Sequence, residues 1–279
     1  MEWRKLKTFI ILILLLVNGF LLVLVAARSQ EAAQYERSAL AQTVKVLERS
    51  GIYADHASLS AADSLVPLSA GRDLERELQI AQALLGKGRI QAENQGGGLY
   101  FYHNGNGDLS VRAGGELSAQ LTGDSDQPVS GSLERHAADL LKKAGIDAEQ
   151  IDVSEDDEWT RVRFRQLWNG APVFSCQVEF AYRGGALASI QGVLLTAGSG
   201  TAEDGQAMTL PTALLRFLDE VTATGDVCSS IQSMQAGYRG TVQSLSGGVR
   251  LTPVWLVATD TASYYLDCVT GSLTRASDQ

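Results

Sequence analysis

Hydrophobic and polar positions divide the chain into one long apolar run and a longer body of short patterned segments. The apolar run extends from Phe9 to Ala27, and only Asn18 interrupts it with a strongly polar side chain. Nineteen helical residues at about 1.5 Å each cover roughly 29 Å, close to the thickness of the hydrocarbon core of a bilayer. The pattern therefore predicts a transmembrane helix over residues 9–27, preceded by a cytoplasmic segment at residues 1–8.

The charges around the apolar run predict its orientation. Arg4, Lys5 and Lys7 precede it, and a positive flank stays in the cytoplasm, so we expect a single-pass protein of the cell membrane with most of the chain outside. A cleaved signal peptide is the alternative, because residues 25–27 (Val-Ala-Ala) have the small side chains of a cleavage site. The length of the run, and Arg28 at its end, favour an uncleaved anchor.

The body of the chain combines helical and strand-like patterns. Apolar residues recur three or four positions apart, as in amphipathic helices, over residues 31–50, 72–85, 133–144 and 210–222. Strand-like segments cover residues 98–103, 109–112, 159–168, 173–182, 186–195, 231–239, 251–259 and 263–269. Asn-Gly pairs separate two pairs of these strands, which indicates β-hairpins at residues 104–105 and 169–170.

These elements predict an α+β fold in which helices pack on one face of antiparallel sheets. The polar stretch at residues 121–131 is rich in Gly, Asp and Ser, and it predicts a linker. The transmembrane helix would then be followed by two tandem α+β modules outside the membrane, at residues 28–122 and 132–279.

The body is acidic. Residues 1–28 hold four basic residues and one acidic residue, which leaves 19 basic and 31 acidic residues and a net charge of −12 for the rest of the chain. Such a surface repels the phosphates of nucleic acids, so we expect no nucleic-acid ligand. A basic peptide or protein surface is the more natural partner.

The cysteines are compatible with two states. Cys176, Cys228 and Cys268 would lie in an oxidising compartment, which allows one disulfide and one free thiol. The alternating apolar segments around Cys176 and Cys268 instead favour buried thiols. The spacing of the three cysteines matches no zinc-binding pattern.

Motifs of enzymes are missing from the sequence. There is no Gly-x-Ser-x-Gly, His-Glu-x-x-His or Walker-type pattern, and His56, His103 and His136 share no short spacing. We therefore predict a protein that is not an enzyme, with no catalytic residue, cofactor, metal ion or small-molecule substrate. A hydrolase whose catalytic residues are scattered along the sequence is the alternative.

Two polar loops were compared with calcium sites. Calcium takes roughly six to eight oxygens around a tight turn, and the straight acidic run at residues 155–158 supplies fewer. We interpret this run as the solvated approach to a strand. A calcium loop that began at Asn104 would need a glutamate at its twelfth position, where this chain has Gly115. We therefore interpret residues 104–108 (Asn-Gly-Asn-Gly-Asp) as a hairpin turn.

Two aromatic sets, at residues 100–102 and 264–265, could line a ligand groove. Side chains alternate between the two faces of a strand, so we expect every second ring in the core and the others at the surface.

Asn18 is the polar exception inside the apolar run. A side-chain amide near the centre of a bilayer lacks partners unless another helix supplies them, and Gly19 beside it permits close approach. A contact of Asn18 and Gly19 with a partner helix is one hypothesis. The other is a polar side chain that simply faces lipid.

Both ends of the chain resemble one family. Residues 1–10 (Met-Glu-Trp-Arg-Lys-Leu-Lys-Thr-Phe-Ile), followed by an apolar helix with Asn18 inside it, resemble the N-terminus of YycI proteins. Residues 253–259 and 264–271 resemble the closing strands of YycI/YycH-like and PepSY-like modules, in which an aromatic strand ends in a Thr-Gly turn.

The resemblance implies a membrane-anchored regulatory protein of a cell-wall two-component system. Its partner would be a YycG/WalK-like sensor histidine kinase in the same membrane, with a related YycH-like protein as a second candidate partner. Regulation would act through the membrane helix and the outer domains. The alternative function is a PepSY-like module that binds a peptide, or inhibits a protease, through its sheet edges.

Overall fold

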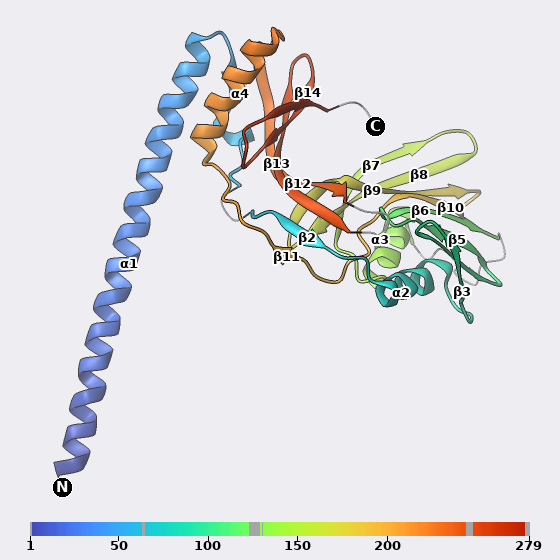
Figure 1. The fold of residues 1–279 in the computed structure, drawn as a ribbon, viewed down its shortest axis with the longest axis horizontal. Helices are drawn as coiled ribbons and strands as arrows, with labels where there is room; N and C mark the ends of the chain where they lie inside the picture. The colour runs from blue at the N-terminus through green and yellow to red at the C-terminus, as the bar shows by residue number, and fades with distance from the viewer. Residues whose placement is uncertain (1, 63–64, 123–128, 130, 244–247, 277–279) are drawn as a thin grey trace.

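A single long helix projects from the body of the protein. The computed structural model describes residues 2–62, 65–122, 129, 131–243 and 248–276. Helix α1 (Glu2–Arg49) has 48 residues, or roughly 72 Å at about 1.5 Å per residue, and its N-terminus lies far from all other elements (Figure 1). Only its C-terminal end packs on the body, where Val44 and Leu47 are buried beside helix α4.

The described part of the body contains three further α-helices, each with a defined start. They are α2 (Leu74–Leu85), α3 (Leu133–Lys143) and α4 (Leu210–Thr224), and a short 3-10 helix covers His56–Ser58. The side chain of Asp73 accepts hydrogen bonds from two backbone N–H groups at the start of α2, and Ser132 accepts one at the start of α3. Pro211 lies in the first turn of α4, where the missing N–H costs nothing.

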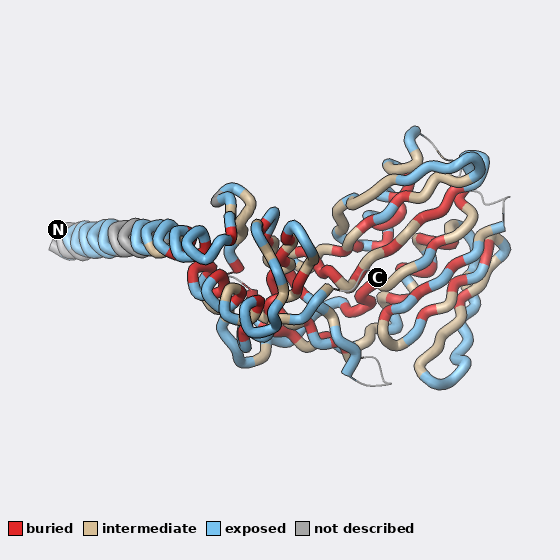
Figure 2. Tube along the Cα trace, turned by 90° about the horizontal axis from the view of Figure 1, so that it is seen from above, coloured by how far each residue is buried: buried red, intermediate tan, exposed pale blue. Residues whose placement is uncertain are grey.

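In the described part of the chain, the strands form one mixed sheet of 15 strands. They are β1 (Tyr53–Ala54), β2 (Leu68–Ala70), β3 (Gln91–Gly96), β4 (Leu99–Asn104), β5 (Gly107–Val111), β6 (Glu116–Leu121), β7 (Ala148–Glu155), β8 (Trp159–Trp168), β9 (Ala171–Arg183), β10 (Ala186–Val193), β11 (Thr201–Ala202), β12 (Ser230–Val242), β13 (Val249–Thr259), β14 (Ser263–Asp267) and β15 (Leu273–Arg275). Buried and exposed residues alternate along many of them (Figure 2).

Two hydrophobic cores lie along this sheet, and β9 contributes to both. One core joins the end of α1 and helix α4 to β12, β13 and β14, with Trp255 and Phe217 fully buried. The other joins α2 and α3 to strands β4 to β10. The start of β9 places Val173 in the first core, and its second half places Phe180 in the second. The chain therefore leaves the first core after β2 and returns to it after β10.

The two parts of the sheet meet where β9 crosses β12. Val173 is aligned with Tyr238 in a single parallel pair. Gly237 makes the close crossing possible, because a Cβ atom there would lie 2.4 Å from the carbonyl oxygen of Pro172 and 2.8 Å from the ring of Phe174. Backbone atoms cannot move aside as a flexible side chain can, so this position requires glycine.

The predicted fold class is wrong. Strands contain 42% of the residues and helices contain 29%. One mixed sheet takes the place of the two tandem α+β modules with antiparallel sheets. The sequence pattern located most elements but not their pairing, because the link between β9 and β12 joins residues 65 positions apart. Among the described residues, moreover, no helix combines the length and apolarity needed to cross a membrane.

Several local predictions are confirmed. The helices expected at residues 72–85, 133–144 and 210–222 exist within two residues of their predicted ends. Both Asn-Gly turns connect hairpins, and Asn169 has the positive φ that such a turn requires. The predicted linker centres on residues 123–128 and 130, which lie outside the described residues, so the boundary between residues 122 and 132 stays a prediction.

Candidate functional site

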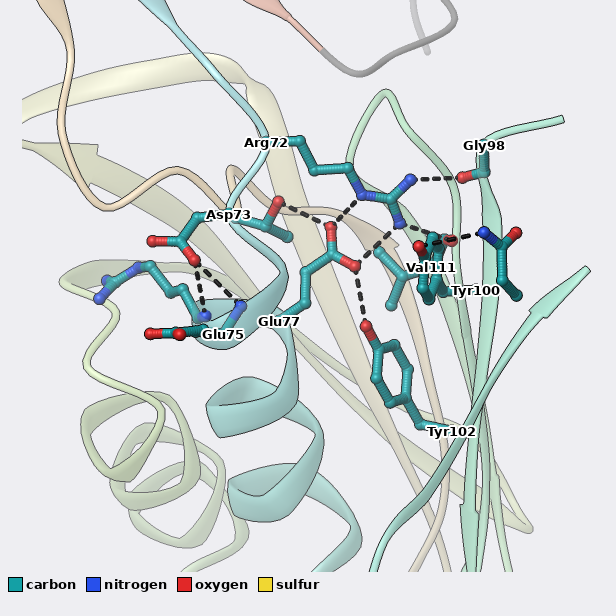
Figure 3. Close-up of polar contacts among 11 residues, drawn as sticks. Arg72, Asp73, Glu75, Glu77, Gly98, Tyr100, Tyr102 and Val111 are labelled. Atoms are coloured by element: carbon teal, nitrogen blue, oxygen red, sulfur yellow. Dashed lines mark hydrogen bonds and ion pairs between the residues drawn. The ribbon is translucent and has the colours of Figure 1, made fainter. Parts of the chain in front are cut away.

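The most deeply buried ionic group is the pair formed by Arg72 and Glu77 (Figure 3). Arg72 directly precedes α2, and Glu77 lies in the first turns of this helix on the side that faces the strands. The guanidinium Nε and Nη2 donate to the two carboxylate oxygens at 2.6 and 2.8 Å. The side chains are 7% and 0% exposed, so the pair has almost no contact with solvent.

Further hydrogen bonds close this cluster completely. The hydroxyl groups of Tyr102 and Thr196 each donate to Glu77 at 3.0 Å, and Arg72 Nη1 donates to the carbonyl oxygen of Gly98 at 2.6 Å. Burial, and then the nearby Glu77 carboxylate, raise the pKa of Tyr102. A perturbed group often marks an active site, but this cluster is almost fully buried and the Glu77 carboxylate already accepts four hydrogen bonds.

The position of the cluster explains its role. Arg72 belongs to the segment that leaves the first core, and Thr196 to the segment that returns to it. Glu77 binds both, so the ion pair fastens the two connecting segments to each other and to β4. We interpret the cluster as a structural clamp between the cores.

The two histidines with described side chains, His103 and His136, lie on different elements. His103 lies on β4 beside Gln91, and His136 lies on α3 with its Nδ1 2.9 Å from the hydroxyl of Tyr182. Burial lowers the pKa of His136, and the charge of Lys143 adds to this effect. His56 is in the 3-10 helix, and its side chain lies outside the described residues. Among the described residues, no group of three His, Cys, Asp or Glu side chains could hold a metal ion.

The two polar loops have structural roles. Asp156 accepts hydrogen bonds from the backbone of Glu158 and Trp159 and pairs with Arg161, so the acidic run forms the β7–β8 turn. In the other loop, the side-chain amide of Asn106 donates to the backbone carbonyl groups of Leu85 and Lys87, at 3.0 and 2.8 Å. Its nitrogen is therefore used to hold the hairpin against the end of α2.

The structure also shows the state of the cysteines and the burial of the aromatic rings. All three cysteines are free thiols, with Cys176 and Cys268 buried and Cys228 half-buried. Burial raises the pKa of Cys176 to about 12. The aromatic residues alternate as expected, because Tyr102 and Tyr264 are buried while their neighbours along each strand are half-buried.

The residues predicted to contact a partner helix lie on the projecting part of α1. The side-chain amide of Asn18 donates to the carbonyl oxygen of Leu14 at 2.9 Å, and nothing lies within 4 Å of the Cβ position of Gly19. Lys7 lies 5.6 Å from the centre of the Trp3 ring, and the side chains of Arg4 and Lys5 lie outside the described residues. Their proposed roles stay predictions.

A groove of about 610 Å³ lies where β12 changes neighbours. Residues 53–60 lie along the first part of β12, with Leu59 aligned with Met234. Strand β9 becomes the neighbour at Tyr238, which is aligned with Val173. The groove lies between these two neighbours, and its described walls are residues 60, 61, 65, 66 and 68 and the β8–β9 turn.

The described residues of the groove lining carry no charge. All thirteen described residues that line it are uncharged, and most are apolar. Among the described residues, no hydrogen-bond partner is found for the indole N–H of Trp168 or for the side-chain amides of Asn169 and Gln235. Mostly apolar walls with a few unused polar groups are typical of a ligand site.

Ser60 fixes one end of this groove. Its hydroxyl group donates to the carbonyl oxygen of Met234 at 3.0 Å and accepts from the backbone N–H of Ala236 at 2.8 Å. The indole N–H of Trp255 donates to the carbonyl oxygen of Ser60 at 3.0 Å. Sequence reasoning missed this groove, because its walls come from three segments that are far apart in the chain and share no motif.

Comparisons with known proteins give a weak likeness of fold. No protein-family model matches the chain, and no curated protein matches it. An uncharacterized protein from Eubacterium rectale is 13% identical, with 81% of this chain and 91% of that one covered and a TM-score of 0.49. The C-terminal domain of YpeB from Bacillus megaterium is 14% identical, with 75% and 100% covered and a TM-score of 0.37.

Both TM-scores are below 0.5, so neither likeness carries an argument about function. None of the comparisons supports membership of the YycI family. The suspected YycI-like identity and the PepSY-like arrangement of strands therefore stay predictions from the sequence.

Proposed function

We propose that this protein is a non-catalytic binding protein that takes an extended, uncharged segment of a partner protein into the groove beside β12. The carrying observation is that the described lining residues are uncharged and present unused amide groups next to a strand edge. A charged side chain in such a groove would lose its hydration without gaining an ion partner. A peptide backbone could instead exchange hydrogen bonds with Asn169 and Gln235.

The edge of β12 already accepts extended segments. Residues 53–60 follow its first part, and β9 meets it at Tyr238. A partner segment between them would continue the same mode of pairing. Addition of an extended peptide to a sheet, with pockets for alternate side chains, is a recurrent form of peptide recognition.

The projecting part of α1 supports a location at a membrane. Large apolar side chains from Phe9 to Leu24 are exposed, with Leu22 at 72% and Leu16 at 70%. Contiguous exposed apolar surface of this kind indicates an interaction site. We propose that lipid covers it and that this contact holds the protein at a membrane.

A partner in the same membrane fits this arrangement. Confinement to one membrane raises the effective concentration of both proteins, so the groove can bind weakly and still be occupied. The resemblance of the two chain ends to YycI proteins suggests a sensor histidine kinase as that partner. To regulate it, the protein must bind one state of the kinase more tightly than the other.

Peptide selection tests the binding function. Displayed random eight-residue peptides are selected on the purified full-length chain, and the affinities of the synthetic winners are measured by fluorescence anisotropy. Ala61 is an exposed residue of the groove wall, and Ala186 is an exposed alanine at the start of β10, outside the groove lining. Ala61→Arg should weaken binding at least about tenfold, or ~1.4 kcal/mol, whereas Ala186→Arg should leave it unchanged.

Equal binding to both variants would place the peptides elsewhere and remove the groove from the proposal. Selection of strongly charged peptides would contradict the proposed chemistry, because no described residue of the lining carries a charge that could pair with them.

A further inference from the structure

Four side chains form a stack on one face of the sheet beside the groove. The guanidinium group of Arg165 lies 5.3 Å from the centre of the Phe174 ring. The rings of Phe174 and Tyr265 are 5.9 Å apart, and the guanidinium group of Arg239 lies 5.1 Å from the Tyr265 ring. Two cations therefore flank two aromatic rings.

The stack continues the rim of the groove along β12. Residues 235, 237 and 239 share one face of this strand, because side chains alternate. Gln235 lines the groove, and Phe174 occupies the space above Gly237. Arg239 is the next side chain on that face, so it lies four residues from Gln235, or roughly 13 Å along an extended strand.

Arg239 has no carboxylate partner among the described residues. It is exposed, and its Nη1 donates a long hydrogen bond of 3.5 Å to the hydroxyl of Thr274. Arg165, by contrast, pairs with Glu149 at 3.3 Å and is largely covered, and its buried Nε has no hydrogen-bond partner. Arg239 is therefore the group that can contact a ligand, while Arg165 contributes positive charge nearby.

The nearby Asp267 and Tyr265 do not form an ion pair with Arg239 among the described contacts. Asp267 follows Tyr265 on the same face of β14, but its Oδ1 accepts two backbone N–H groups of the following turn, both at 2.8 Å. Burial raises the pKa of Tyr265, while the charges of Arg239 and Arg165 act in the opposite sense. Both guanidinium groups thus act on the same hydroxyl.

We infer that the partner segment carries one Asp or Glu side chain, which Arg239 binds beside Tyr265, about four residues along the chain from the residues that fill the groove. This inference rests on the proposed function and makes it more specific. The neutral groove selects uncharged side chains, and the first open cation next to it selects a carboxylate. The orientation of the segment decides whether the acidic residue comes before or after the uncharged ones.

Defined peptides test this inference. The probe is an eight-residue peptide of alternating Val and Ser, acetylated and amidated, with Asp or Asn at its first or its last position. One of the two Asp peptides should bind the full-length chain about two- to fivefold more tightly than its Asn counterpart, as expected for an exposed ion pair. The difference should shrink as salt is added.

Variants assign the effect to Arg239. Arg239→Gln should abolish the preference for Asp over Asn, and Arg239→Glu should create a preference for a Lys peptide. Arg163→Gln is the matched control, because Arg163 is exposed on β8 and already paired with Asp152. A reversed charge preference cannot come from a general loss of folding.

The outcomes separate the two proposals. If Asp and Asn peptides bind the groove equally well, the carboxylate inference is wrong and the groove proposal stands. If none of the peptides binds, and Ala61→Arg changes nothing, the groove proposal fails and this inference fails with it.

Discussion

Replacement of Glu77 by Gln should remove a large part of the stability of the fold. The variant keeps the shape of the side chain and deletes its charge, which leaves the Arg72 guanidinium 93% buried without a counter-ion. Loss of one partner of a buried ion pair costs about 3–5 kcal/mol. That is a large share of the roughly 5–15 kcal/mol that holds a typical domain folded. The assay is urea unfolding of the full-length chain, followed by circular dichroism.

Two comparisons isolate the cause. The double variant Arg72→Met with Glu77→Gln removes both charges and should recover about half of the loss or more, because no uncompensated charge stays buried. Asp152→Asn breaks the exposed pair with Arg163 and should cost less than about 1 kcal/mol. A loss below about 1 kcal/mol for Glu77→Gln would refute the interpretation of the cluster as a clamp between the cores.

Three further predictions concern other parts of the fold. Gly237→Ala should destabilise the protein by about 1–3 kcal/mol in the same unfolding assay, because its Cβ would lie 2.4 Å from a backbone oxygen of β9. Gly71→Ala is the control, because nothing lies within 4 Å of that Cβ position, and it should change stability by less than about 0.5 kcal/mol. Burial lowers the pKa of His136 in the folded protein. The free energy of unfolding should therefore be highest above the unfolded pKa of about 6.5 and should fall as the pH drops below that value. His136→Asn should reduce this dependence on pH in urea unfolding curves taken at several pH values. Native thiol titration with a disulfide reagent should modify Cys228 first and leave Cys176, whose pKa is raised to about 12, unmodified until the protein unfolds.

The sequence was most informative where structure is local. Helix α2 has an acidic cap at Asp73 and a glycine at its end, and the Asn169-Gly170 turn has the residues that a tight hairpin needs. These features depend on a few neighbouring residues, so apolar periodicity predicted the helix and the Asn-Gly pair predicted the turn, whereas the Asp73 cap was not predicted. The alternation of buried and exposed aromatic rings followed from the same local geometry.

The polar strands and the pairing of strands were beyond this reasoning. All six residues of β3 are exposed, so the strand has no apolar alternation and exists only because it pairs with β4. The crossing of β9 and β12 depends on Gly237, whose role becomes visible only when Phe174 lies above it. The groove depends on that crossing, which is why no sequence motif located it.

Site-specific photo-crosslinking in cells tests the central claim most directly. A photoreactive amino acid replaces Asn169 in the groove wall or, as a control, Gly184 in the exposed β9–β10 turn, and mass spectrometry identifies the cross-linked peptide. Position 169 should capture one segment of a membrane protein, with a run of uncharged residues and an Asp or Glu nearby, and Ala61→Arg should abolish the product. Capture of the same proteins at positions 169 and 184, or of highly charged segments at position 169, would contradict the central claim.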